Sequence, residues 1–330
     1  MHQVRALAVR SLWPVAAGSL AAALLAVACS SPQGKTVDKV TRPPRPALPP
    51  RTYALAGPLI PATTTMVSAW DIPADPIYDE SLDRGPEAEE IRLGYRIFTN
   101  TTHEAPGISA GAMTCANCHL NAGQRERSLP LVGVSAAYPE MNRRAERMFT
   151  IEDRIIECFM RSENGTEKTT TFPTPESKEV KAVKAYLDWL SRGHEKGKSP
   201  AWRGKNAIPQ DKLIPIGKLD PQMGEVLFLE KCINCHGADG QGVQIGDKKA
   251  GPLWGPNSWN DGAGAARVYT LAGIIRYAMP YLDPGSLSDE EAQHIAAYIT
   301  AQPRPAYPFK DRDYAKAGPP VDAVYYPSRK

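Results

Sequence analysis

Two copies of the pattern C-x-x-C-H constrain this chain more than any other feature. They are CANCH at 115–119 and CINCH at 232–236. C-x-x-C-H is the attachment signature of c-type haem, in which both thiols form thioethers and the histidine binds the iron. A redox dithiol does not require the histidine, and a zinc site would need partner pairs that the sequence lacks. We therefore predict two covalently bound haem c groups, attached at Cys115, Cys118, Cys232 and Cys235, with His119 and His236 as axial ligands.

The surroundings of the two motifs also repeat. Each motif follows an amphipathic stretch with G-x-x-x-F, at 94–98 and 224–228, and each precedes a second helical pattern, with Tyr186 and Tyr298 at matching positions. Helix, haem motif, irregular segment and closing helix make the class I cytochrome c fold, in which the glycine lets the first and last helices cross against an aromatic residue. The predicted fold is mainly α, with two tandem class I cytochrome c-like domains.

The amino terminus has the features of an export signal. Arginines precede an apolar run at 15–28, which is shorter than the roughly 20 residues that span a bilayer. Either an ordinary signal is cleaved near Ala28, or Cys29 is lipidated and becomes the mature amino terminus. We predict lipidation of Cys29 and a periplasmic protein that meets the membrane only through this anchor.

These patterns divide the chain into six parts. We predict a signal peptide at 1–29, a Pro-rich linker at 30–69, a first haem domain at 70–195, an interdomain linker at 196–214, a second haem domain at 215–302 and a tail at 303–330. The net charge of +3 is small and is not gathered into a basic run, which argues against a nucleic-acid partner.

Each iron needs a second axial ligand or an open site. In the second haem domain, Met279 lies 43 residues after His236, where a class I cytochrome carries its distal methionine. Met223 is the alternative, but its helical spacing predicts a core position. The first haem domain has no methionine in the matching place, and its distal ligand stays open among five side chains: Met148, Met160, Cys158, His103 and His194.

Cys158 is the sixth cysteine of the chain and lies in EDRIIECFMRSENG, residues 152–165. Arg154 and Arg161 flank it at helical spacing, and positive charge stabilises a thiolate. The competing interpretation is a small buried hydrophobic residue. We expect the two methionines of the first haem domain to pack in its core and the two histidines to be solvated.

The sequence resembles the dihaem cytochrome c thiosulfate dehydrogenases, which couple two thiosulfates to tetrathionate. The resemblance extends over about 90–300 and is carried by CANCHLNAG, PLVGVSAAYP, EDRIIECFMRSENG, DWLSRG and PLWGPNSWNDGAG. It implies that Cys158 is the distal ligand of a catalytic first haem and that Arg154, Arg144 and Ser162 line the active site. Arginine forks would neutralise and orient two sulfur dianions that otherwise repel each other.

The resemblance also implies a path for the electrons. They would pass from the first haem to the second and on to a redox partner such as a small cytochrome c or a high-potential iron–sulfur protein. SENG at 162–165 departs from the usual S-M-N-G, and Ala278 replaces a lysine of some members, which concerns the tuning of the second haem and the preferred direction. The alternatives are a non-catalytic dihaem electron-transfer cytochrome and a dihaem peroxidase with an open iron.

Overall fold

The computed structural model describes residues 75–82, 84–245 and 248–327. These residues belong to one compact unit. The predicted signal peptide, the lipidation of Cys29 and the Pro-rich linker lie outside the described residues. Within these ranges, no helix is both long and apolar enough to cross a membrane.

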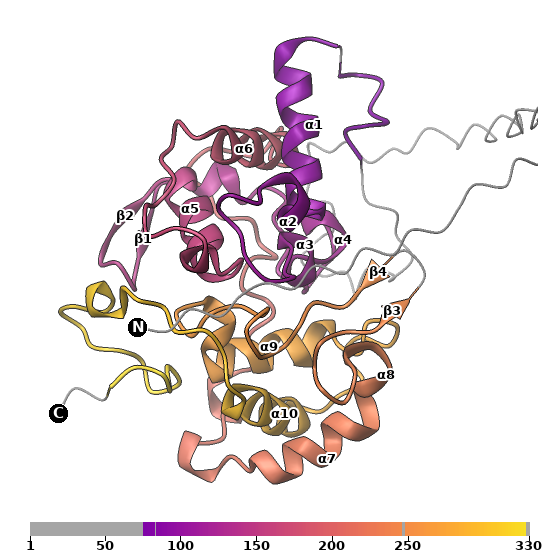
Figure 1. The fold of residues 1–330 in the computed structure, drawn as a ribbon, viewed down its shortest axis with the longest axis vertical. Coiled ribbons are helices and arrows are strands. Elements are labelled where there is room, and N and C mark those ends of the chain that lie inside the picture. Colours follow the sequence, from indigo (N-terminus) through magenta and orange to yellow (C-terminus); the bar gives the residue numbers. More distant parts are fainter. Residues whose placement is uncertain (1–74, 83, 246–247, 328–330) are drawn as a thin grey trace, which may run out of the picture. The chain divides into compact units, whose positions relative to one another are not determined.

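Where the structure describes it, the first haem domain contains six α-helices and one short hairpin (Figure 1). The helices are α1 (Pro86–Thr99), α2 (Thr101–Glu104), α3 (Cys115–Cys118), α4 (Leu120–Gly123), α5 (Ile151–Arg161) and α6 (Lys178–Leu190). Strands β1 (Glu140–Asn142) and β2 (Arg147–Phe149) pair antiparallel, with Met141 opposite Met148.

The second haem domain repeats the order of helix, haem motif and closing helix. Its helices are α7 (Pro221–Lys231), α8 (Ile233–His236), α9 (Val268–Ala278) and α10 (Asp289–Ala301), and its strands are β3 (Gln244–Ile245) and β4 (Lys248–Lys249). Short 3-10 helices complete the described chain: η1 (Ser135–Ala137), η2 (Gly165–Glu167), η3 (Gln210–Lys212), η4 (Ile216–Lys218), η5 (Gly264–Ala266) and η6 (Lys310–Arg312).

The first and last helices of each domain cross at a glycine, as the G-x-x-x-F pattern predicts. A Cβ on Gly94 of α1 would collide with the carbonyl oxygen of Ala182 in α6. A Cβ on Gly224 of α7 would collide in the same way with the carbonyl oxygen of His294 in α10. Only a residue without a side chain permits so close a backbone approach.

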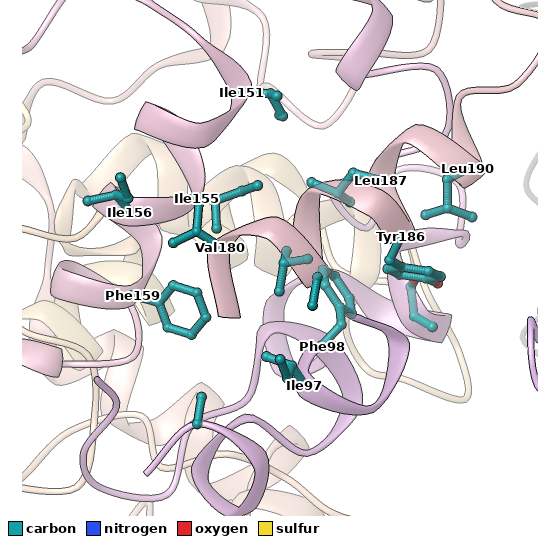
Figure 2. Close-up of a cluster of buried hydrophobic side chains, with 14 of the residues drawn as sticks. Ile97, Phe98, Ile151, Ile155, Ile156, Phe159, Val180, Tyr186, Leu187 and Leu190 are labelled. Carbon is teal, nitrogen blue, oxygen red and sulfur yellow. The ribbon is translucent and has the colours of Figure 1, made fainter. Parts of the chain in front are cut away.

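An aromatic pair packs beside each crossing. The ring centroids of Phe98 and Tyr186 are 5.5 Å apart, and those of Phe228 and Tyr298 are also 5.5 Å apart. In Figure 2, Phe98 and Tyr186 lie in the first core, with side chains of α5 such as Phe159 beside them. The repeated geometry confirms two class I cytochrome c-like domains in a mainly helical chain.

Segments predicted as linker and tail pack into both cores. Trp202 belongs to the first core and donates its indole N–H to the Val132 carbonyl at 3.1 Å. Ile208 belongs to the second core, and Tyr307 from the tail returns to the first. The exact domain boundaries stay predictions, but these segments contribute buried surface as well as connection.

Five rejected ligand candidates can now be placed. His194 was predicted to be solvated, but it is half-buried, with its ring centroid 5.6 Å from that of Trp202. Met160 is buried in the first core as predicted, and the His103 side chain is 75% exposed as predicted. The core positions predicted for Met148 and Met223 are wrong, because these residues are 50% and 41% exposed. Helix α7 buries only Gly224 and Phe228, so its apolar pattern does not identify its buried face.

Candidate functional site

Helix α5 sets the positions of the predicted site residues. It begins at a capping box, in which the Thr150 hydroxyl accepts from the Asp153 N–H at 3.2 Å and the Asp153 carboxylate accepts from the Thr150 N–H at 3.0 Å. From this start, Arg154, Cys158 and Ser162 follow at intervals of four residues. This spacing places them on one face of the helix.

Cys158 lies close to the first haem-attachment motif. Burial, the Glu163 carboxylate and the Cys158 sulfur together raise the pKa of Cys118 to about 12, and the Cys158 sulfur also contributes to the raised pKa of Cys115. These two sulfurs are thioethers once haem is attached, so the shifts matter here as a sign of proximity. Cys158, which the spacing and the family resemblance select as a ligand, therefore lies near both haem-attachment cysteines.

His119 has the hydrogen bond that an iron ligand needs. Its Nδ1 lies 2.6 Å from the Leu129 carbonyl oxygen, and because a carbonyl can only accept, Nδ1 carries the proton. Nε2 is then left unprotonated for a metal. Burial lowers the pKa of His119 to about 4, an effect that the Leu129 carbonyl opposes and Arg154 reinforces. The imidazole is therefore neutral, and the first site fits a haem iron.

The second haem motif shows the same preference for a neutral histidine. Burial lowers the pKa of His236, and the Gly251 carbonyl partly offsets this effect. Met279 is half-buried at the end of α9, where its N–H donates to the Ile275 carbonyl at 3.1 Å. Its role as distal ligand stays a prediction.

Arg154 has the charge and the position expected of a cation in an anion-binding site. It is half-buried, and the Cys158 sulfur is the main cause of its raised pKa, against the opposing effect of burial. The structure thus brings Arg154 and Cys158 together, as their helical spacing predicts. A guanidinium has five N–H donors in a planar fork, a geometry that suits the binding of an oxyanion.

Sequence reasoning missed a polar group that lies beside Arg154. Arg203 donates to both Glu140 carboxylate oxygens, at 2.6 and 2.7 Å. Tyr138 interacts electrostatically with this pair and with Arg154. Burial raises the pKa of Tyr138 to about 12, and Arg154 opposes the rise. Because Glu140 and Arg203 are 63 residues apart in sequence, no local motif could have predicted the group.

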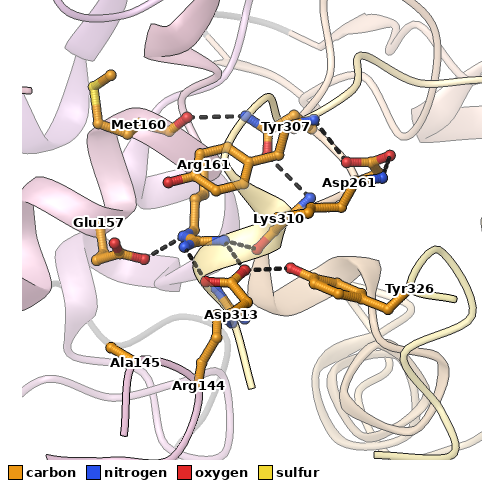
Figure 3. Close-up of polar contacts among 12 residues, drawn as sticks. Arg144, Ala145, Glu157, Met160, Arg161, Asp261, Tyr307, Lys310, Asp313 and Tyr326 are labelled. Carbon is orange, nitrogen blue, oxygen red and sulfur yellow. Dashed lines mark hydrogen bonds and ion pairs between the residues drawn. The ribbon is translucent and has the colours of Figure 1, made fainter. Parts of the chain in front are cut away.

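Arg161 pairs with two carboxylates, which the sequence-based expectation of a cation free to act on Cys158 did not foresee. It is 3% exposed, and its two terminal nitrogens donate to the Asp313 carboxylate at 2.8 Å each (Figure 3). It also bonds Glu157 and the Gly262 carbonyl, and its guanidinium lies 3.9 Å above the Tyr307 ring. Two carboxylates neutralise this arginine, so it anchors the carboxy-terminal segment to α5.

Arg144 lies with the same carboxy-terminal segment. Its carbonyl accepts from the Tyr314 N–H at 2.7 Å, and its charge opposes the rise that burial causes in the pKa of Tyr307 and Tyr326. Figure 3 shows its side chain beside Asp313. Its Nε is buried without a hydrogen-bond partner in the part of the chain that the structure describes.

Of the two residues that follow α5, Glu163 borders the first haem motif. The Ser162 N–H donates to the Cys158 carbonyl at 2.8 Å. Glu163 is 2% exposed, and burial raises its pKa to about 8, while a hydrogen bond with Cys115 opposes the rise. The sequence marked Glu163 only as a departure from S-M-N-G, and its burial beside the haem-attachment residue was not foreseen.

Comparison with known proteins agrees with this geometry. Residues 104–195 match the family described as SoxA/TsdA, cytochrome c domain, and residues 220–299 match cytochrome C oxidase, cbb3-type, subunit III. The chain is 36% identical over 234 residues to the thiosulfate dehydrogenase of Stutzerimonas stutzeri (strain A1501), covering 71% of this chain and 73% of that protein. The chain belongs to the thiosulfate dehydrogenase family.

Two further members of the thiosulfate dehydrogenase family extend the comparison. The enzyme of Allochromatium vinosum is 34% identical over 232 residues, covering 68% of this chain and 82% of its own. The solved thiosulfate dehydrogenase (TsdBA) of Marichromatium purpuratum, in its as-isolated form, aligns with a TM-score of 0.63 at 34% identity and covers 71% of this chain. This chain spans half the length of that protein. The family and both domain matches identify a c-type cytochrome enzyme with covalently bound haem c.

Proposed function

We propose that this chain is a periplasmic enzyme with two haem c groups that oxidises two thiosulfates to tetrathionate or catalyses the reverse. The observation that carries the proposal is the placement of Arg154 beside Cys158, next to the first haem-attachment motif. In the proposed site, His119 and Cys158 hold the first iron, and His236 and Met279 hold the second. Names of the relatives support thiosulfate as the substrate.

The reaction requires cations more than it requires a general base. Two thiosulfate dianions form one sulfur–sulfur bond and release two electrons, and no proton is transferred. Bound haem supplies one-electron oxidation, so two haems match the two electrons. Arg154 would donate two parallel hydrogen bonds to a sulfonate and offset the repulsion between the anions. Arg144 and Ser162, which the family resemblance assigns to the active site, would complete the binding of the second anion.

The electrons would leave through the second haem domain. Cys118 packs against the core of the second haem domain, whereas Cys115 packs against the core of the first. The Cys118 side of the first haem motif therefore adjoins the second domain, and this cysteine would hold one edge of the haem there. The acceptor would be a small cytochrome c or a high-potential iron–sulfur protein, and a lipid on Cys29 would keep the enzyme at the membrane.

The test adds thiosulfate to the oxidised holoprotein and follows the haem absorption bands. We expect thiosulfate to reduce the haems and tetrathionate to reoxidise them. Arg154→Gln should slow thiosulfate-dependent reduction by at least about tenfold, the effect of losing roughly 1.4 kcal/mol of transition-state stabilisation. Arg143→Gln, which changes an exposed arginine in the turn between β1 and β2, should react like the wild type.

A holoprotein that exchanges electrons with a cytochrome c but responds to neither sulfur anion would contradict the proposal. That result would instead favour a non-catalytic dihaem electron-transfer cytochrome.

A further inference from the structure

The loop that follows the first haem motif reaches the segment that carries Met279. The Arg125 Nη2 donates to the Tyr281 carbonyl at 2.9 Å, and the guanidinium lies 4.5 Å from the centre of the Tyr281 ring. Arg127 lies 5.5 Å from the centre of the Tyr277 ring. Tyr277 and Tyr281 flank Met279 two residues away on each side. Both tyrosines therefore contact arginines of the first haem domain, and the Tyr277 ring also lies 5.3 Å from Arg276 of its own helix.

A third contact fixes the same segment from the same loop. The Tyr281 hydroxyl donates to the Asn121 side-chain oxygen at 3.1 Å. Asn121 is two residues after His119, and the loop ends at Leu129, whose carbonyl accepts from the His119 imidazole. The segment around Met279 therefore contacts the loop 120–129. This loop begins next to His119, the proximal ligand of the first haem, and ends at the residue that His119 hydrogen-bonds.

Arg125 is a charged residue, yet its side chain is almost completely buried. It is 2% exposed, and its Nη1 has no hydrogen-bond partner among the residues that the structure describes. Burial lowers its pKa, and Tyr281 is the group that opposes this shift. The contacts that the structure shows for its guanidinium are therefore with Tyr281, whose carbonyl accepts a hydrogen bond and whose ring lies against the cation.

We propose that Arg125 and Arg127 are positioning residues for the second haem, which hold Met279 in place as its distal ligand and favour the reduced iron. The inference rests on the ligand assignment in the proposed function. Two effects follow from the contacts. Fixing Tyr277 and Tyr281 restricts the intervening methionine to one conformation. A buried positive charge near the haem favours the reduced state, because ferrous iron carries one positive charge less than ferric iron.

The experiment compares the wild-type holoprotein with Arg125→Gln, Arg125→Lys, Met279→Leu and the exposed control Arg143→Gln. Two readouts are measured: the weak far-red absorption band of a methionine-ligated ferric haem and the reduction potential of each haem. In Arg125→Gln we expect at least half of the band to be lost and the reduction equilibrium of the second haem to fall about tenfold, or 59 mV for one electron. Arg125→Lys should lie between this variant and the wild type, and Arg143→Gln should match the wild type.

The outcomes separate the positioning role from the ligand assignment. Met279→Leu should abolish the far-red band; a retained band would refute both the ligand assignment and the inference built on it. If that variant loses the band while Arg125→Gln keeps both the band and the potential, the positioning role is wrong and the ligand assignment stands. If Arg125→Gln does not fold, the charge-conserving Arg125→Lys decides, because a purely structural contact would lower its melting temperature without moving the potential.

Discussion

Replacing Arg161 with glutamine tests the division of labour between the two arginines of α5. The change removes both hydrogen bonds to Asp313, the bond to the Gly262 carbonyl and the contact with the Tyr307 ring. Asp313 is 4% exposed and would be left as a buried carboxylate without its cation. Breaking a buried ion pair in this way costs about 3–5 kcal/mol.

A loss of this size is visible in thermal unfolding of the holoprotein. For a folded unit at the upper end of the range of about 150–250 residues it corresponds to a fall of roughly 6–10 °C in Tm. Arg161→Lys keeps the charge but loses the paired hydrogen bonds, so its Tm should lie between those of Arg161→Gln and the wild type. A double-mutant cycle with Asp313→Asn should show a coupling energy above about 0.5 kcal/mol, as expected for residues in direct contact.

Activity separates Arg161 from Arg154. Below its melting temperature, Arg161→Gln should still be reduced by thiosulfate at close to the wild-type rate, because its guanidinium is occupied by Asp313 and Glu157. Arg154→Gln should show the opposite behaviour, with slow reduction and a smaller change in Tm. The reasoning is refuted if Arg161→Gln melts within about 2 °C of the wild type and loses thiosulfate-dependent reduction.

Two further predictions concern the helix crossing and the buried carboxyl group. Gly224→Ala should lower the free energy of unfolding, measured by guanidinium titration, by about 1–3 kcal/mol, because the new Cβ meets the His294 carbonyl. The control Gly217→Ala has open space around its Cβ, so its free energy of unfolding should stay within about 0.5 kcal/mol of the wild type. Equal effects of the two substitutions would contradict the close helix crossing. Glu163 has a pKa of about 8 in the folded state against 4.5 in a model peptide. Between these two pH values the unfolded chain binds fewer protons than the folded chain. The free energy of unfolding should therefore fall as pH rises, by up to about 1.4 kcal/mol per pH unit. Glu163→Gln should flatten this dependence, and an unchanged slope would show that another group causes it.

Local patterns predicted much of the fold because the repeated elements are short-range features. The local pattern S-x-x-E at 288–291, which is typical of a capping box, forms one with bonds of 2.7 and 3.1 Å. The glycine and aromatic residues of each helix crossing also lie where the repeats place them. Periodicity failed at Met223, because α7 is apolar on more than one face and the burial of each face depends on partners elsewhere in the chain.

The candidate site was predictable only where its residues share one helix. Arg154 and Cys158 are one turn apart, so their proximity follows from helical geometry. Arg161 is equally close in sequence, but Asp313, 152 residues later, captures its guanidinium. The Glu140–Arg203 pair depends on a tertiary contact of the same kind. Long-range pairing of charges leaves no mark in a local pattern.

The most direct test of the central claim is electron paramagnetic resonance of the oxidised holoprotein and of Cys158→Ala. We expect a low-spin signal typical of histidine and thiolate ligation in the wild type. That signal should be absent in Cys158→Ala, with the second haem unchanged. An identical spectrum in both proteins would show that Cys158 does not bind the first iron, and the proposed active site on α5 would be wrong.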